Sequence, residues 1–187
     1  MSTELRFTIH DLDLLPENGN RYEIIDGELY VSTQPHWRHQ LACGRLYYAI
    51  VSWNEREGAG LAIEAPGVIF AEDEAVAPDL VWISRERLAR VLGDDGKLHL
   101  APDLVVEVLS PGPKNEERDR EVKLKLYSRR GVREYWIADW RDLTLQVYRR
   151  ENARLAHVAT LTAEDTLTSP LLPGFAWSIV GLKASLY

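Results

Sequence analysis

The chain of 187 residues has a single cysteine and no long hydrophobic run. Cys43 alone cannot form a disulfide within the chain, which fits a reducing compartment, and we therefore expect a cytoplasmic protein. No segment approaches the roughly 20 consecutive apolar residues that a membrane-spanning helix needs, so no membrane partner is expected. Residues 1–16 contain acidic side chains and no apolar segment, so no secretory signal is expected there.

Motifs of several enzyme classes are also missing. The sequence has no Gly-rich phosphate-binding loop, no dinucleotide fingerprint, no nucleophile elbow and no Cys-x-x-Cys pair. His36 and His39 lie three residues apart, but this spacing alone is not a zinc signature.

Basic residues are outnumbered, with 22 Lys and Arg against 29 Asp and Glu and a formal net charge of −7. An acidic protein does not attract polyanions through its overall charge, so a nucleic-acid partner would require a local basic patch or metal ions. The length and the 45% content of hydrophobic residues predict one globular domain, residues 1–187, with a sizeable core.

Apolar periodicity predicts an α/β chain with a mixed sheet. Asp26-Gly27 between the strand-like segments Arg21–Ile25 and Glu28–Val31 predicts an N-terminal hairpin with a type I′ turn. Near the end of the chain, the segment 169–179 contains too many prolines for a helix and is expected to be an extended cover or a subunit contact. Further strands are predicted at residues 61–64, 67–70, 79–83, 103–109, 134–138, 144–149 and 155–161, and helices at 7–16, 84–92 and 115–131.

A long helix is expected after Pro35 and continues to about Arg56. Its apolar stripe, widened by Ala42, Leu46 and Ile50, is expected to face the core. The stripe itself consists of Trp37, Leu41, Tyr48 and Val51.

Glu107 is the one charged residue in the run Leu104–Leu109, which is typical of a strand covered on both faces. A carboxylate is rarely buried in such a strand without a positive partner. The sequence leaves three kinds of partner open: a metal ion, Lys123 or Lys125 in the following helix, or an arginine.

Asp79 and Asp103 are the other acidic residues at apolar strands. Asp103 and Glu107 are four residues apart on one face, about 13 Å at the rise of a strand, which is too far to share one ion with bonds of about 2.1 Å. Asp103 is therefore expected to be a turn residue at the start of its strand. Asp79 is the better second ligand.

The helix after this strand is rich in cations. Only one of Lys123 and Lys125 can point inward, because they lie on different faces. Acidic neighbours offset the positive charge of the arginines in this region, so most of these arginines are expected to be solvated. They are Arg118, Arg120, Arg129, Arg130 and Arg133.

Several ordered segments together resemble the Uma-type family of restriction-endonuclease-like proteins, which is similar to the PD-(D/E)XK nuclease superfamily. The resemblance extends from about Phe7 to Ile179. It implies a restriction-endonuclease-like core, a mixed β-sheet flanked by helices, with the N-terminal hairpin and antiparallel C-terminal additions. The segments are YEIIDGELYV, PHWRHQ, VAPDLVWIS, APDLVVEVLSPGP, KLKLY, GVREYWIAD and SPLLPGF.

The resemblance also implies a site. Asp79 matches the PD position and Glu107 the acidic position of (D/E)XK, and both would bind Mg²⁺ or Mn²⁺. Leu109 stands where the lysine is usual, and Lys123 matches the lysine that the family takes from the next helix. Glu28 and His39 lie in matching segments as possible accessory residues.

The implied activity is that of a metal-dependent endonuclease that hydrolyses phosphodiester bonds of nucleic acid, with DNA as the expected substrate and a homodimer as the expected assembly. One alternative is a catalytically inactive nuclease-fold module that binds a protein or a nucleic acid. Another is a metal-dependent hydrolase of a smaller phosphoester.

Overall fold

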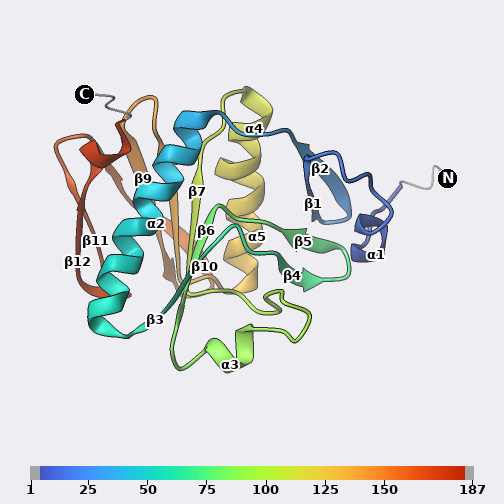
Figure 1. Ribbon diagram of the computed structural model, residues 1–187, viewed down its shortest axis with the longest axis horizontal. Helices are drawn as coiled ribbons and strands as arrows, with labels where there is room; N and C mark the ends of the chain where they lie inside the picture. The colour runs from blue at the N-terminus through green and yellow to red at the C-terminus, as the bar shows by residue number, and fades with distance from the viewer. Residues whose placement is uncertain (1–4, 184–187) are drawn as a thin grey trace.

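The computed structural model describes residues 5–183 and shows helices on a mixed sheet (Figure 1). None of the described helices is both long and apolar enough to cross a membrane. The helical segments are α1 (Ile9–Leu12), α2 (Trp37–Glu57), α3 (Leu88–Val91), α4 (Pro113–Glu117), the π-helical turn η1 (Arg118–Val122), α5 (Lys123–Arg130) and the 3₁₀ turn η2 (Ile179–Leu182). The strands are β1 (Arg21–Ile25), β2 (Glu28–Ser32), β3 (Gly60–Glu64), β4 (Val68–Ala71), β5 (Glu74–Val76), β6 (Leu80–Ser84), β7 (Leu104–Val108), β8 (Glu134–Asp139), β9 (Thr144–Glu151), β10 (Arg154–Leu161), β11 (Thr166–Ser169) and β12 (Leu172–Ser178).

The main sheet has six strands in the order β10-β9-β8-β7-β6-β3. β7 and β8 pair in parallel, and the other neighbours pair antiparallel. A parallel pair needs a crossover connection, which the segment α4–η1–α5 supplies. The predicted mixed sheet with flanking helices is therefore confirmed.

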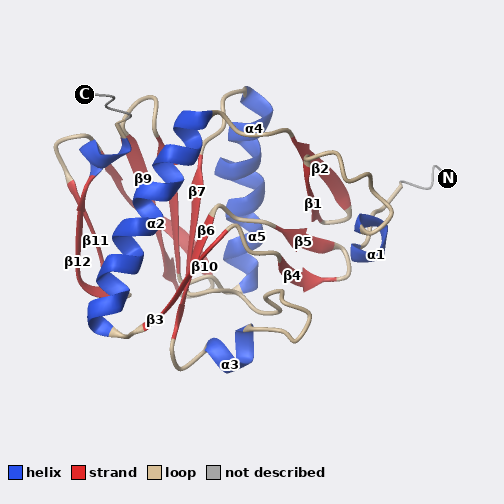
Figure 2. Cartoon of the chain, viewed as in Figure 1, coloured by secondary structure: helices blue, strands red, loops and turns tan. Residues whose placement is uncertain are grey.

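The two faces of β7 follow from the alternation of side chains along a strand. Leu104, Val106 and Val108 pack in one core with residues of α2. Val105 packs in the other with Leu126 of α5. Glu107 has the same parity as Val105, so its side chain belongs to the face covered by α5. Figure 2 shows the helices that cover the sheet in blue and the strands in red.

Helix α2 is rotated relative to the prediction. Trp37 and Tyr48, which were expected in the core, are 49% and 73% exposed. Trp82 and Trp136 occupy much of the core beneath α2, where Ala42, Leu46 and Ile50 of the helix pack together with Trp53. The buried residues of α2 are His39, Ala42, Cys43, Leu46, Ile50 and Trp53.

A smaller sheet, in the order β2-β1-β5-β4, lies beside the main one (Figure 1). Asp26 and Gly27 have φ values of 54° and 77°, as the predicted type I′ turn of the β1–β2 hairpin requires. Arg129 of α5 bonds to both Asp26 and Glu74, which joins this sheet to the helix. The hairpin is thereby held next to the segment that connects β7 and β8.

The C-terminal segment forms the hairpin β11–β12 and the turn η2, and it lies against α2 rather than projecting from the chain. Leu172, Phe175 and Ile179 are buried in the core that α2 shares with the sheet. Trp53 of α2 donates a hydrogen bond to the carbonyl of Pro173 at 2.8 Å. The expected extended cover is therefore present, and its apolar side chains contact the chain's own core.

Three predicted helices have other bounds. The first, expected at 7–16, is only α1, Ile9–Leu12. Ser84 is the last residue of β6, with its N–H bonded to Asp103, so only the short α3 forms after it. The helix after β7 begins with Pro113, two residues before the predicted start at 115. Proline suits a first helical position because its missing N–H would have no partner there.

Candidate active site

A cavity of about 160 Å³ lies at the carboxyl end of β7. Leu80 pairs with Val106 in the antiparallel β6–β7 ladder, so Asp79 lies level with Glu107. The register therefore brings together two acids that are 28 positions apart in the sequence. The polar and charged residues lining the cavity are Arg21, Glu23, Ser32, Thr33, Gln34, His39, Asp79, Glu107, Ser110, Arg118, Asp119 and Lys123.

Glu107 is buried and accepts two hydrogen bonds. Lys123 Nζ and Tyr127 Oη both donate to its Oε1, each at 2.8 Å. Burial raises the pKa of Glu107 to about 8 although the Lys123 charge opposes this shift. Both bonds end on Oε1. The other carboxylate oxygen, Oε2, accepts neither of them and can bind a ligand in the cavity.

Lys123 is 1% exposed and is surrounded by carboxylates. Besides Glu107, its Nζ lies 2.9 Å from Glu23 Oε1 and 3.8 Å from Asp119 Oδ1. Burial opposes the charged form, but these three carboxylates outweigh it and raise the pKa of Lys123. Lys125 is exposed, so the choice of Lys123 over Lys125 as the inward cation agrees with the structure.

Glu23 is a residue of this cluster that the sequence analysis did not select. It is 1% exposed, and its Oε1 also accepts the N–H of Ala77 at 2.9 Å. A weaker signal was present, because Glu23 directly precedes the two isoleucines of β1, Ile24 and Ile25, and is buried with them. The same question about a buried carboxylate, asked of both strands, would have found it.

Arg118 was expected to be solvated, and this was wrong. It is buried and donates to Asp119 Oδ1 at 3.0 Å and to Ser32 Oγ at 2.6 Å. An α-helix would place Arg118 about 140° around the axis from Lys123, since it turns about 100° per residue. The π-helical turn η1 lets the Lys123 N–H bond to the Arg118 carbonyl five residues back, which brings both side chains to the cavity. Such turns are frequent at functional sites.

Asp79 is held by three donors. The Val108 N–H and His39 Nε2 lie 2.9 and 3.3 Å from its Oδ2, and Arg21 Nη1 lies 3.1 Å from its Oδ1. Burial raises the pKa of Asp79, but His39, Arg21 and the Val108 N–H outweigh burial and lower it to about 2. Asp79 is thus an ionised carboxylate at neutral pH, and each of its oxygens has a second lone pair for a further ligand.

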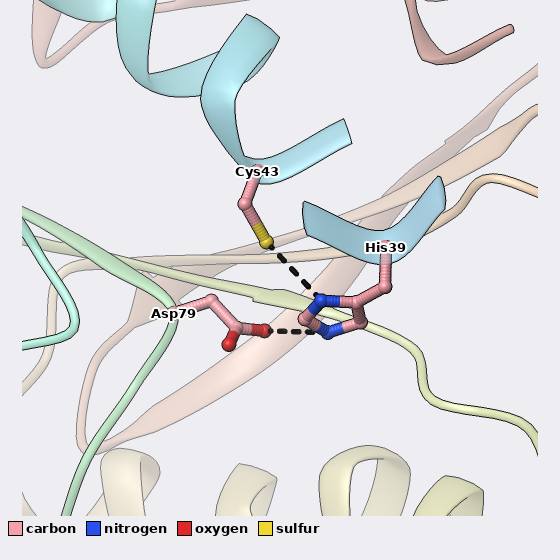
Figure 3. A group of neighbouring side chains, drawn as sticks. All are labelled: His39, Cys43 and Asp79. Atoms are coloured by element: carbon pink, nitrogen blue, oxygen red, sulfur yellow. Dashed lines mark hydrogen bonds and ion pairs between the residues drawn. The ribbon is translucent and has the colours of Figure 1, made fainter. Parts of the chain in front are cut away.

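His39, Cys43 and Asp79 form a group whose potential ligand atoms lie within 4.8 Å of one another (Figure 3). The imidazole lies between the thiol and the carboxylate, with Cys43 Sγ 3.6 Å from Nδ1. Burial raises the pKa of Cys43, so its thiol stays protonated and is a poor metal ligand. The Asp79 bond and charge outweigh the burial of His39 and raise the pKa of its imidazole. We therefore interpret His39 as a partner that orients Asp79.

Glu28 lies outside the site. It is an exposed residue at the start of β2 and accepts a hydrogen bond from Tyr30 Oη at 2.9 Å. It does not appear among the residues that line the cavity.

Asp103 also lies away from the cavity, at the other end of β7. It is fully buried and accepts bonds from the Ser84 N–H and from Arg87 and Arg133, at 2.8, 2.8 and 3.0 Å. Burial raises the pKa of Asp103, but these three donors outweigh it and keep the pKa below the ordinary value. Its role in the fold is to fix the start of the strand, as a residue at that position was expected to do.

Replacing Asp103 with asparagine is expected to lower the free energy of unfolding by about 1.5–3 kcal/mol, the usual worth of hydrogen bonds to a charged group. Because the folded-state pKa is depressed, the stabilisation is present above the ordinary value of 3.8 and is lost as the pH falls through the folded-state pKa. Urea unfolding at neutral and acidic pH measures this difference. A variant as stable as the wild type at neutral pH would contradict the assignment.

The charges in the cavity nearly balance. Among the lining residues, four carboxyl groups (Glu23, Asp79, Glu107 and Asp119) face three permanent cations (Arg21, Arg118 and Lys123) and the imidazole of His39. Carboxylate oxygens suit hard divalent ions such as Mg²⁺ and Mn²⁺. One such ion would make the cavity electropositive and favourable for a phosphate group. The residues present therefore fit a hard cation held by Asp79 and Glu107.

Comparison with known proteins gives two matches. The chain resembles the crystal structure of a "putative nuclease belonging to DUF820" from Anabaena variabilis, with a TM-score of 0.73 and 19% sequence identity over 94% of this chain and 97% of the other. At this low sequence identity, the structural similarity shows a shared fold. No curated protein matches the chain. The model of the family described as "Uma2: Putative restriction endonuclease" matches residues 9–180. The chain therefore belongs to the Uma2 family of restriction-endonuclease-like proteins.

Proposed function

We propose that the protein is an endonuclease that hydrolyses phosphodiester bonds of DNA with Mg²⁺ or Mn²⁺. One observation carries the proposal. Asp79 and Glu107 lie level on adjacent strands at the edge of one cavity, and Lys123 bonds directly to Glu107 at 2.8 Å. This combination of two acids and one lysine is what the family motif requires, although Lys123 comes from a helix.

Asp79 Oδ1 and Glu107 Oε2 would hold the ion, since the other oxygens carry more of the protein's own hydrogen bonds. When bound, the divalent ion supplies Lewis acidity toward the phosphate and lowers the pKa of water. His39 and Arg21 hold Asp79 in place, and Tyr127 holds Glu107.

Lys123 supplies the fixed positive charge of the site. Its ammonium is held between Glu107 and Glu23 and can orient the attacking water or stabilise charge on the phosphate. Arg21 and Arg118 line the same cavity and can contact the phosphate oxygens. These cations offset locally the repulsion that a net charge of −7 produces.

Mn²⁺ is expected to bind the wild-type protein and to be lost from both Asp79→Asn and Glu107→Gln. Because a ligand must be deprotonated and burial raises the pKa of Glu107 to about 8, the affinity should rise with pH up to that value. Titration calorimetry in two buffers with different ionisation enthalpies measures both the affinity and the released proton. Asp103→Asn is the matched control, and binding that survives both site substitutions would remove the basis of the proposal.

An inactive binding module is the second candidate. It is favoured by the contacts of Glu107, because Lys123 and Tyr127 satisfy this carboxyl without an ion. Plasmid, single-stranded DNA, RNA and a small phosphodiester, assayed in parallel with Asp79→Ala as control, distinguish this candidate and a small-phosphoester hydrolase from the nuclease. No turnover of any substrate with any divalent ion would favour the binding module.

We also propose a cytoplasmic, single-domain protein that acts as a homodimer, as its family resemblance implies. Leu172, Phe175 and Ile179 of the C-terminal segment are buried within the chain, so these three side chains are not available to such an interface. Light scattering of the purified protein at several concentrations determines the assembly.

A further inference from the structure

An exposed group of aromatic and cationic side chains lies at the N-terminus of α2. It consists of His36, Trp37, Arg38 and Trp140, and we call it the aromatic platform. Trp37 is 49% exposed, and His36 and Arg38 are exposed as well. An exposed indole does not contribute the hydrophobic free energy that its burial would give. The same helix buries its other tryptophan, Trp53, which is only 2% exposed.

The side chains of the platform are stacked on one another. The rings of His36 and Trp140 lie 5.3 Å apart at 9°, and those of His36 and Trp37 lie 5.7 Å apart at 28°. The Arg38 guanidinium lies 5.1 Å from the centre of the Trp37 ring and 6.0 Å from that of Trp140. His36 Nδ1 accepts the Arg38 N–H, which fixes the orientation of its ring. The platform is thus an ordered group of stacked rings, with His36 and Trp140 nearly parallel.

The platform is continuous with the catalytic cavity. Trp140 Nε1 donates to the carbonyl of Leu109, directly after β7, so it lies at the same end of this strand as Glu107. A second hollow of about 280 Å³ shares Thr33, Gln34 and Ser110 with the cavity and extends to His36. A third, of about 510 Å³, continues from Trp140. The stacked rings of His36 and Trp140 link the third hollow to the second, which shares lining residues with the cavity.

The third hollow is basic although the protein as a whole is acidic. Arg38, Arg141 and Lys183 line the third hollow. Arg141 is bonded to Asp139 and Glu116, so Arg38 and Lys183 supply most of the charge available to a ligand. Two cations beside stacked rings offer contacts to a phosphate backbone and to flat bases at the same time.

We propose that the aromatic platform binds unpaired bases of a single DNA strand and directs the phosphodiester that follows into the cavity. The proposal rests on the proposed nuclease function. Bases of a duplex are already stacked on one another, whereas those of a single strand present faces on which an indole can stack. Stacking does not depend on the base, so the platform selects strand state and not sequence.

Binding of a fluorescein-labelled oligothymidylate, measured by anisotropy at low salt in EDTA, tests the platform without cleavage. Trp37→Ala is expected to weaken this binding by about 5- to 150-fold, the range that loss of one stacked base implies. Trp37→Phe should retain most of the affinity, and a duplex of the same length should lose much less. Tyr48→Ala is the control, since Tyr48 is an exposed aromatic residue of the same helix at 73% exposure, outside the platform.

Four results would overturn the proposal. Two concern Trp37→Ala, which would bind oligothymidylate as tightly as the wild type or lose as much affinity for the duplex as for the single strand. The third is tighter binding of oligouridylate than of oligothymidylate by the wild type, and the fourth is dissociation of a dimer by the substitution. The last would make the platform an interface between copies. Cleavage is scored separately with the wild type and Mn²⁺. Absence of cleavage with the expected binding pattern contradicts the nuclease function and leaves the platform supported, whereas cleavage without the binding loss contradicts the platform alone.

Discussion

Replacing Glu107 with glutamine is expected to abolish DNA cleavage, lowering kcat/KM by at least about a hundredfold, while the protein stays folded. The amide keeps the shape of the carboxyl group and can still accept the hydrogen bond from Tyr127 Oη. Lys123 keeps Glu23 at 2.9 Å as a partner. What the variant loses is the negative charge that would hold the ion, so chemistry is affected far more than packing.

The stability of the same variant should depend on pH in a defined direction. The folded-state pKa of Glu107, about 8, lies above its ordinary value of 4.5, so ionisation of this group favours unfolding. The wild-type protein therefore loses stability as the pH rises through that interval, and Glu107→Gln does not share this loss. Urea unfolding at two pH values inside and below the interval measures the difference between the two proteins.

Asp103→Asn is the matched control for cleavage, because it makes the same chemical change at the opposite end of the same strand. Asp103→Asn is expected to be less stable than the wild type, so it is assayed well below its melting temperature. Under that condition it should cleave DNA as the wild type does. Cleavage by Glu107→Gln at a rate close to that of the wild type would show that this carboxylate has no catalytic role. Equal loss in both variants would indicate instability instead.

The sequence was sufficient for the parts of the site that follow from strand patterns. An acid inside a continuous apolar strand identifies Glu107, and the spacing limit of a strand removes Asp103 as a co-ligand. Asp79 precedes another apolar strand, and antiparallel pairing of the two strands then places both acids at one level. The sequence thus selects the two acids as candidates, whereas the pairing of β6 with β7 is a result of the structure.

The remaining members of the site depend on tertiary structure. Arg118 reaches the cavity because of a π-helical turn. Such a turn cannot be predicted from helical periodicity, because the periodicity assumes the same rotation for every residue. Glu23 reaches it because the small sheet packs beside α5. The rotation of α2 was missed for a related reason: two apolar stripes compete, and the shape of the sheet beneath decides which one is buried.

Replacing Lys123 with methionine is expected to lower the free energy of unfolding by about 3–5 kcal/mol near neutral pH, a large part of the usual stability of a domain. Methionine fits a similar volume but removes the one cation that Glu23, Glu107 and Asp119 share at 2.9, 2.8 and 3.8 Å. Lys125→Met, two residues along the same helix and exposed, should change stability by less than about 0.5 kcal/mol. Urea unfolding of both variants in parallel measures the contrast.

The pH dependence of Lys123→Met identifies the cause of the loss. Burial already raises the pKa of Glu107 and of Asp119, and removing Lys123 takes away a charge that opposes both shifts. The carboxyls then protonate at higher pH, so the destabilisation should shrink as the pH is lowered and grow as it is raised. Adding Glu107→Gln to Lys123→Met should restore part of the stability, because one uncompensated carboxylate is gone. A loss that is independent of pH and is not relieved in the double variant would mean that Lys123 stabilises the fold by packing rather than by its charge.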